Sequence, residues 1–449
     1  MQRLVHLFFS MNRSGIILCS FAAVIAVGTL LLMLPIANEN GRWLSFVDAL
    51  FTATSAACVT GLSVIDTAKD LSIFGQVVLI ILIQIGGVGL MTITTLFSIG
   101  LGKRINIGQR LLIQESLNQG APEGVIRMAL DIIKYTLIIE FIFGTALAFY
   151  FYEILGVLDK ALYWGYWHAI SAFSNAGFDL MGGYASLTAF SNNLPVNLIF
   201  MALIILGGLG FTVIGDIRHK RSWRYLTLHT KIVLVVNTIL LFGGALLFWI
   251  LEADNPFTLG DLSFGDQWLV SFFQSVTART AGFNTVDIAL LNGATLTLIM
   301  ALMFIGASST STGGGIKTTT FAVLLMSTLA LLRGKKDVVI FNRRIDASTI
   351  SKSNSIFVLA QLWLVFAFFL LLAFDTNGNS YELILFELVS AFSTTGLGVG
   401  ITVEWNDWCK MILITTMYVG RIGILTFSMS FFNKKVDRIR YPAENILIG

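Results

Sequence analysis

The sequence is poor in charged residues. Of its 449 residues only 12% are Asp, Glu, Lys or Arg, whereas 56% are apolar, and the mean hydropathy is +0.81. Soluble domains carry about 25% charged residues, so this shortage excludes an ordinary soluble protein and indicates a polytopic membrane protein. The longest polar stretches, 103–123, 216–231 and 333–355, are too short to enclose a core of their own.

Cysteine and proline are also scarce. The three cysteines, Cys19, Cys58 and Cys409, are scattered and odd in number, which argues against a disulfide framework or a metal site. Of the five prolines, four lie at or beyond the ends of apolar segments and one lies in the tail, so none interrupts a span. The N-terminus lacks a signal-peptide cleavage pattern, and segment 16–36 is long enough to cross a bilayer and remain there.

Enzyme and nucleotide-binding motifs are absent. The sequence contains no HExxH, GxSxG, Walker or GxGxxG element and no paired aspartates within its apolar segments. His168 stands alone, and we expect it to be a hydrogen-bonded structural histidine. We therefore predict that the protein is not an enzyme and holds no cofactor of its own.

The sequence does contain a short stretch that occurs four times. Each copy closes a semi-apolar run of about three helical turns, and the glycines at its centre are separated by 116, 105 and 114 residues. Ten residues before each glycine the chain has an aromatic residue, and five before it a small one. This is an internal repeat, whose copies are Thr60-Gly61-Leu62, Ala176-Gly177-Phe178, Ala281-Gly282-Phe283 and Thr395-Gly396-Leu397.

Each repeat predicts a spanning helix, a short re-entrant helix that ends at the glycine, and a second spanning helix. The first spans are expected at 16–36, 126–155, 233–251 and 356–374, and the second at 74–101, 194–213, 294–332 and 409–432. The fold class is therefore an all-α integral membrane protein of four fused membrane-pore-membrane repeats. Eight transmembrane helices and four re-entrant pore helices would surround one pseudo-fourfold pore, with repeats at 1–106, 107–222, 223–340 and 341–449, the last including a cytoplasmic tail.

The basic residues predict the orientation. Of 29 Lys and Arg, 22 fall in the terminal segments and in the loops between repeats, such as Arg218, Lys220 and Lys335. By the positive-inside rule these segments and both termini are cytoplasmic. The opposite loops are mildly acidic, and we expect only five basic residues on that outer face, namely Arg42, Lys69, Lys160, Arg279 and Lys410.

The four glycines indicate an ion filter. A dehydrated cation needs oxygen ligands on all sides, and rings of backbone carbonyls supply them. Consecutive carbonyls face one axis only with dihedral angles that favour glycine, and each preceding helix directs its negative end towards the ion. We predict that K+ binds at the carbonyls of Val59, Thr60, Gly61, Asn175, Ala176, Gly177, Thr280, Ala281, Gly282, Thr394, Thr395 and Gly396.

A second glycine motif follows each filter and differs in two repeats. Repeats one and two read Gly86-Gly87-Val88-Gly89 and Gly207-Gly208-Leu209-Gly210, whereas repeat four has Arg421 at the second position. We expect Arg421 just below the filter, bonded to Ser308, Ser309 or Thr310. Repeat three is too rich in glycine and hydroxyl residues for a lipid-facing helix, so it predicts an unwound loop. The predicted gate is Arg421 and this loop: Gly306, Ala307, Ser308, Ser309, Thr310, Ser311, Thr312, Gly313, Gly314, Gly315 and Lys317.

As a set, these features resemble the Trk/Ktr/HKT superfamily of potassium transporters, in particular its KtrB-type conducting subunits. The resemblance covers nearly the whole chain. It implies a homodimer in the bacterial plasma membrane with one pore per subunit, potassium uptake gated by the loop, and sodium dependence in some members. It also implies a cytoplasmic octameric ring of KtrA-type RCK subunits that binds ATP, ADP and cyclic di-AMP. Some plant relatives that prefer sodium carry Ser at the first filter glycine, so the intact Gly61 favours potassium.

A secondary cation symporter, K+/Na+ or K+/H+, remains the alternative. Such proteins usually have inverted repeats and membrane-buried coupling acids. Here the repeats run parallel, and the candidate acids are only Glu140, near a span centre, and Glu387, in a re-entrant helix. We therefore favour gated, passive permeation over coupled transport.

Overall fold

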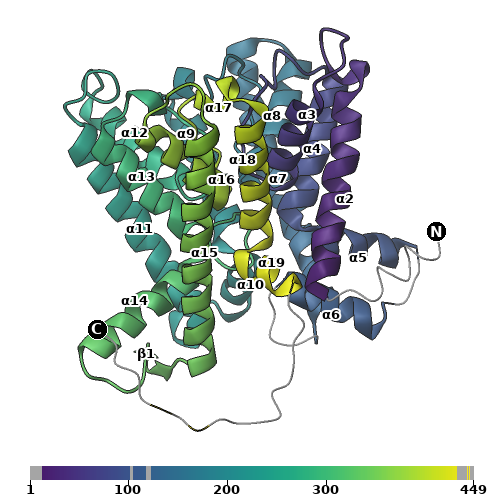
Figure 1. The fold of residues 1–449 in the computed structure, drawn as a ribbon. Helices are drawn as coiled ribbons and strands as arrows, with labels where there is room; N and C mark the ends of the chain where they lie inside the picture. The colour runs from purple at the N-terminus through teal and green to yellow at the C-terminus, as the bar shows by residue number, and fades with distance from the viewer. Residues whose placement is uncertain (1–12, 102–104, 118–122, 432–441, 443, 445–449) are drawn as a thin grey trace.

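The computed structural model describes residues 13–101, 105–117, 123–431, 442 and 444. Between its loops, the regular elements of this part are helices apart from one antiparallel hairpin of β1 (Val339–Ile340) and β2 (Arg343–Arg344) (Figure 1). The expected all-α class is therefore confirmed. Basic residues 103, 104, 434 and 435, Pro122 and both chain ends lie outside the described residues. The minor helices are α6 (Ile107–Ser116), α17 (Ile401–Glu404), η1 (Pro35–Ala37), η2 (Thr188–Phe190), η3 (Trp223–Tyr225) and η4 (Ile288–Leu290).

Four long helices are apolar and long enough to cross a membrane. They lie where the first span of each repeat is expected and extend those spans at their N-terminal ends. Their outer faces expose large apolar side chains such as Leu30, Phe141, Phe242 and Leu362. A water-soluble surface rarely carries so much exposed apolar area, whereas lipid favours it. The helices are α2 (Arg13–Met33), α7 (Val125–Leu155), α11 (Leu228–Glu252) and α15 (Ala347–Phe374).

A short helix follows each long one and packs against it. The C-terminal turns of these helices are buried, and each ends three to five residues before a repeat glycine. Two of them begin at a serine cap, because the Ser45 and Ser263 hydroxyls accept the amides of Asp48 and Asp266 at 3.1 and 3.3 Å. They are α3 (Phe46–Ala57), α8 (Leu158–Phe173), α12 (Phe264–Thr277) and α16 (Tyr381–Ser393), in the upper half of Figure 1.

The predicted second spans are not single helices. In repeats one, two and four the chain bends by 96°, 92° and 98°. The break occurs at Gly89, Gly210 and Gly423, whose φ angles of 90°, 95° and 90° cannot continue a right-handed helix. The helix pairs are α4 (Ile73–Val88) with α5 (Leu90–Gly100), α9 (Leu194–Leu209) with α10 (Phe211–Lys220), and α18 (Asp407–Ile422) with α19 (Ile424–Ser430).

In repeat three the expected unwinding is confirmed. Helix α13 (Gly293–Ile305) ends at Gly306, and α14 (Thr318–Leu332) begins twelve residues later. The 306–317 loop between them contains no helical turn. Glycine and hydroxyl residues favour this outcome, because their backbone or side-chain groups compete with helical hydrogen bonds.

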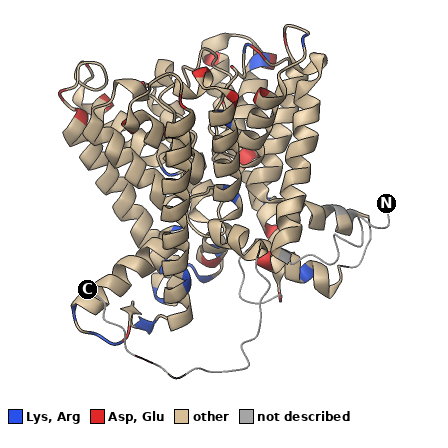
Figure 2. Cartoon of the chain, viewed as in Figure 1, with Lys and Arg blue, Asp and Glu red and all other residues tan. Residues whose placement is uncertain are grey.

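The four units close into a ring of packed helices. The third helix of each unit contacts the short helix of the next: α4 packs on α8, α9 on α12, α13 on α16, and α18 on α3 of the first unit. In Figure 2, Lys and Arg gather at the lower end near α10, α14 and the hairpin, whereas acidic residues gather mainly at the upper end.

The close helix crossings depend on glycine. A Cβ atom on Gly86, Gly207 or Gly420 would overlap the backbone carbonyl at the end of a short helix, that of Ala57, Phe173 or Phe392. These positions therefore need a residue without a side chain. Backbone atoms cannot move aside as a flexible side chain can, so any larger residue must separate the two helices.

We expect Gly420→Ala to lower the thermal unfolding midpoint in detergent by several degrees, because overpacking of this kind costs about 1–3 kcal/mol. Gly243→Ala is the matched control: Gly243 lies within α11, and a Cβ there meets nothing within 4 Å. Alanine favours a helix over glycine by about 1 kcal/mol, so the control should keep or raise the midpoint. Equal midpoints for the two variants would contradict this account of the crossing.

Candidate functional site

The four repeat glycines meet at one place. A Cβ atom built on Gly61 would lie 2.5 Å from the Ala176 carbonyl oxygen, and one on Gly177 would lie 2.8 Å from that of Ala281. Likewise Gly282 abuts the Thr395 carbonyl, and Gly396 abuts the Thr60 carbonyl. Each glycine thus touches the backbone of the next repeat, and the fourth touches the first. We call this closed arrangement of Gly61, Gly177, Gly282 and Gly396 the glycine ring.

The strands of the glycine ring share an unusual backbone conformation. All four glycines have positive φ angles, between 71° and 92°. Two residues earlier, each strand has a non-glycine residue in the left-handed region, namely Val59, Asn175, Thr280 and Thr394, with φ between 52° and 69°. Such residues cost of order 1–3 kcal/mol each and cluster at functional sites. In each strand the glycine and the residue two positions before it are left-handed, and the residue between them is not. This alternation allows consecutive carbonyls to point to the same side.

Hydroxyl groups of the short helices hold these strands. The Ser55 and Ser390 hydroxyls accept the amides of Gly61 and Gly396, each at 3.1 Å. In repeat two the direction is reversed, and the Ser171 hydroxyl donates a hydrogen bond to the Phe178 carbonyl at 2.6 Å. The sequence analysis missed these serines. The signal was available, because Ser occurs six residues before the glycine in three of the four repeats.

Several buried polar atoms around the glycine ring have no hydrogen-bond partner within the described part of the chain. They are the hydroxyl oxygens of Thr60, Thr280, Thr394 and Thr395 and the amide nitrogen of Asn175. Buried polar groups are normally bonded, so each exception calls for an explanation. All five belong to predicted filter residues, which the structure brings together.

The 306–317 loop lies directly against the strands of the glycine ring. Gly313 abuts the Thr280 hydroxyl and Gly314 abuts the Thr394 hydroxyl, so closely that a Cβ atom would fit at neither glycine. The amides of Thr312 and Ser308 donate to the Gly207 and Gly208 carbonyls at 3.2 and 3.1 Å. The loop is thereby fixed to the end of α9 in repeat two.

The loop is also bonded within itself. The Lys317 ammonium donates to the Gly313 and Gly314 carbonyls at 2.6 and 3.3 Å, and the Ser311 hydroxyl donates to the Ser308 carbonyl at 2.7 Å. Gly306 and Gly315 sit at the two ends with φ angles of 57° and 69°. The loop is therefore a compact, partly buried plug. The remaining predicted residues, Ala307, Ser309 and Thr310, lie in the same plug.

Arg421 connects the loop to two other repeats. Its guanidinium donates to the Thr312 carbonyl and to the Gly86 carbonyl of α4. The predicted position beside the loop is correct. The predicted partners among Ser308, Ser309 and Thr310 are wrong, because the loop folds back and presents Thr312 to α18. Both contacts have a charged donor, and such hydrogen bonds are stronger than those between neutral groups.

Arg279 is not on the outer face. It is only 5% exposed and lies between the end of α12 and the filter strand that follows. Its guanidinium donates to the Gly306 carbonyl at 3.0 Å and to the Asn237 side-chain oxygen. The expectation failed because the sequence position indicates only which loop carries a residue. The long side chain reaches inward from there.

The other polar residues singled out by the sequence have local roles. His168 bonds to the Trp164 carbonyl at 2.7 Å and the Leu180 amide at 3.1 Å, as expected of a structural histidine. Glu387 accepts the Val399 amide at 3.0 Å and so supports the chain beyond the filter. Glu140 accepts from Gln84 of α4 at 3.1 Å, away from the ring.

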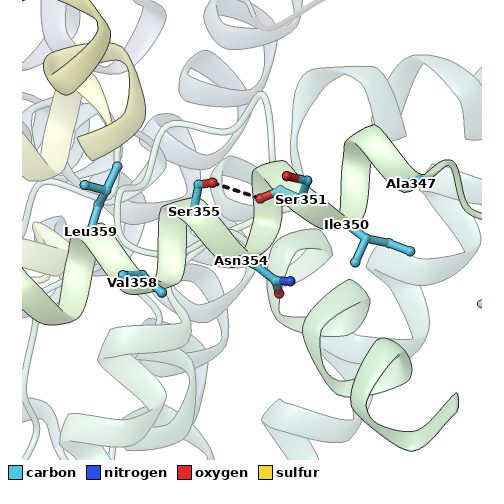
Figure 3. A pocket seen from close by; sticks show the side chains of 7 residues that line it. All are labelled: Ala347, Ile350, Ser351, Asn354, Ser355, Val358 and Leu359. Carbon is cyan, nitrogen blue, oxygen red and sulfur yellow. Dashed lines mark hydrogen bonds between the residues drawn. The ribbon is translucent and has the colours of Figure 1, made fainter. Parts of the chain in front are cut away.

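A surface hollow runs along α15 at some distance from the glycine ring. Figure 3 shows its lining, which comes from one helix and is mostly apolar. Its only hydrogen bond among the residues drawn joins the Ser355 hydroxyl to the Ser351 carbonyl of the same helix. No polar groups converge there, so it is not the candidate site. Among the described residues no group of three His, Cys, Asp or Glu could hold a metal ion.

Comparison with known proteins shows the family of this chain. A family description, TrkH, cation transport protein, matches residues 6–438. The chain belongs to the TrkH family of cation transport proteins. "Ktr system potassium uptake protein B" of Vibrio alginolyticus is 42% identical over 97% of this chain and 94% of its own length. "Potassium/sodium uptake protein NtpJ" of Enterococcus hirae is 38% identical over 97% and 96%.

A solved structure supports the fold. The potassium transporter TrkH from Vibrio parahaemolyticus superposes with a TM-score of 0.72 at 20% identity and covers 94% of this chain and 85% of that one. With its long apolar and bent helices, this TrkH-family chain is therefore a multi-pass membrane protein.

One titratable group of this TrkH-family protein lies two residues beyond the glycine ring. Burial raises the pKa of the Asp179 carboxyl to about 6. The negative charge of Asp66 raises this pKa further, whereas the hydrogen bond from the Met181 amide lowers it. Asp179 is therefore mostly ionised at a pH of about 7.5 and mostly neutral at about 5.

We expect the cation concentration for half-maximal uptake to rise about two- to fivefold between those pH values, because one nearby charge contributes about 0.5–1 kcal/mol. Asp179→Asn should have the higher value at both pH values. Asp254→Asn, in an exposed outer loop, is the control and should keep the wild-type response. An unchanged pH response in Asp179→Asn would assign the effect to another group.

Proposed function

We propose that this protein is a potassium-uptake subunit that conducts K+ through the glycine ring. The observation that carries the proposal is the closed contact of the four glycines with the carbonyls of Thr60, Ala176, Ala281 and Thr395. Backbone carbonyls can replace the hydration shell of K+. The name of the Vibrio alginolyticus relative, a potassium uptake protein, supports the choice of ion; the name of the Enterococcus hirae relative includes both potassium and sodium.

The ring further suggests one pseudo-fourfold pore per chain. The circular packing of third helices on short helices supports four membrane-pore-membrane repeats with the boundaries predicted from the sequence. In this arrangement α3, α8, α12 and α16 are the re-entrant pore helices, and their C-terminal dipole ends face the ion. Three of the four second spans are then bent at a glycine, and the remaining one is divided by the 306–317 loop.

The 306–317 loop and Arg421 act as the gate in this proposal. The loop abuts two filter strands and is bonded to repeat two, and Arg421 ties it to repeats one and four. A cation passing a guanidinium at about 7 Å meets roughly 2 kcal/mol of repulsion at an effective dielectric constant near 20. The plug and the charge therefore oppose permeation together, and opening requires both to move.

A cytoplasmic partner would supply the control. The word "system" in the name of the Vibrio alginolyticus relative supports a second component, for which we propose a ring of KtrA-type RCK subunits that binds ATP, ADP or cyclic di-AMP. Arg221, Lys335 and Lys336 are exposed and directly follow α10 and α14, the helices near which basic residues gather at the lower end of Figure 2. We further propose a homodimer in the bacterial plasma membrane with both termini cytoplasmic, and sodium dependence as a property to be measured.

Coupled symport is the second candidate, and the structure offers two buried acids for it. Glu140 is 5% exposed and has one oxygen without a partner among the described residues. It accepts from Gln84, however, on the side of α4 where α7 packs, and Glu387 supports the chain after the filter. Within the described part of the chain no hydrogen bond or ion pair joins either acid to the 306–317 loop, which favours gated permeation.

Gly61→Ser tests the filter. Gly61 has a φ angle of 92°, and its Cβ atom would lie 2.5 Å from the Ala176 carbonyl oxygen, so serine must displace a neighbouring strand. We expect about tenfold weaker discrimination of K+ against Na+, equivalent to about 1.4 kcal/mol. The measurement is uptake in a potassium-transport-deficient host, with and without a co-expressed RCK subunit and external sodium. If the unmodified protein already carries both ions equally, the filter proposal is wrong.

Arg421→Gln and a deletion of residues 309–312 test the gate. Each should raise the maximal K+ uptake rate severalfold to tenfold, because about 1.4 kcal/mol of barrier corresponds to tenfold. Discrimination against Na+ should not change, since neither alters the glycine ring. Uptake must be normalised to protein in the membrane. A well-expressed deletion with the wild-type rate would refute the gate.

A further inference from the structure

Repeat three departs from the others at two positions that contact each other. Three residues before the glycine, repeats one, two and four have the small residues Cys58, Ser174 and Ser393, but repeat three has Arg279. In those three repeats a glycine of the next helix packs on the adjacent backbone. In repeat three that helix has already ended, and Gly306 turns into the 306–317 loop.

Arg279 starts a buried chain of hydrogen bonds that reaches both ends of the loop. Its guanidinium donates to the Gly306 carbonyl and to Asn237 of α11. Asn237 donates to the Ser308 hydroxyl oxygen at 3.0 Å, and the Thr318 hydroxyl donates to the same oxygen at 3.1 Å. Gly306 and Ser308 begin the loop, and Thr318 is the first residue of α14.

The charge of Arg279 is balanced by dipoles. No carboxylate forms an ion pair with it within the described ranges, although it is only 5% exposed. A buried charge without a counter-ion is costly, so its stabilisation must come from the Gly306 and Asn237 oxygens and the negative end of α12. The Gly306 contact, and with it the Asn237–Ser308 hydrogen bond, is lost if the loop end moves away. The charge therefore stabilises the position of that end.

We propose that Arg279 is a positioning residue that fixes the start of the 306–317 loop to the filter strand of repeat three. The proposal rests on the gate function proposed for that loop. Arg421 binds the middle of the loop at Thr312, whereas Arg279 binds its first residue, so the two arginines have separate roles. Arg279 sets where the loop pivots, and Arg421 holds the pivoting part closed.

The test is a double-mutant cycle in the uptake assay. Arg279→Met should raise the maximal K+ uptake rate about three- to tenfold in the full-length protein. In the protein that lacks residues 309–312 it should have no further effect, because residues that act through one element are non-additive. Arg42→Met, which removes an exposed guanidinium far along the chain from the loop, is the matched control and should change neither rate. Discrimination of K+ against Na+ should stay at the wild-type value throughout.

Each other outcome is decisive. The proposal would be overturned if Arg279→Met raised the uptake rate by the same factor in the full-length and the deleted protein, or if it weakened discrimination of K+ against Na+. Either result would place Arg279 in support of the filter itself. If Arg279→Met does not reach the membrane, Ser308→Ala removes the shared acceptor without changing the core. It should raise the rate by a smaller factor only when the loop is intact, and an unchanged rate would overturn the proposal. If the deletion of residues 309–312 alone leaves the uptake rate unchanged, the proposed gate is wrong. If the deletion raises the rate but its effect and that of Arg279→Met are additive, the gate stands and Arg279 has no part in it.

Discussion

The structure depends on backbone-to-backbone contact at the glycine ring. Four strands approach so closely that none of the glycines has room for a Cβ atom, and each strand holds two residues with positive φ. This conformation has a cost of several kcal/mol in total. It persists because the short helices end directly before it, their serines bind the strands, and the third helices pack tightly on the helix ends.

The contacts below the ring follow from the same constraint. Where a third helix continues past a short helix, glycine is needed at the crossing, as at Gly86, Gly207 and Gly420. Where the helix stops, at Ile305, the space is occupied by a loop of small and polar residues and by two long arginines. Helix and loop are thus two ways of filling the volume beneath the ring, and only the loop can be rearranged without unpacking a span.

Much of this could be predicted from the sequence, because regular spacing reports on backbone requirements. The glycines at equivalent positions of the four repeats predicted the ring, and the run from Gly306 to Gly315 predicted the unwound loop. The bends were missed, since Gly86 and Gly89 belong to one motif and only the φ angle distinguishes a packing glycine from a bending one. The sequence also does not show the direction in which a long side chain points. For this reason Arg279 was placed on the outer face and Arg421 was given the wrong partners.

The ring is made by a single chain, and this has a consequence for its symmetry. In a tetramer of identical subunits every residue near the axis must occur four times. Four guanidinium groups about 7 Å apart would repel one another by roughly 2 kcal/mol per pair, and four plugs could not share one space. A chain that carries four non-identical copies escapes this rule. It can keep four similar strands at the glycine ring, and one layer below it can place a single loop and one copy each of Arg279 and Arg421.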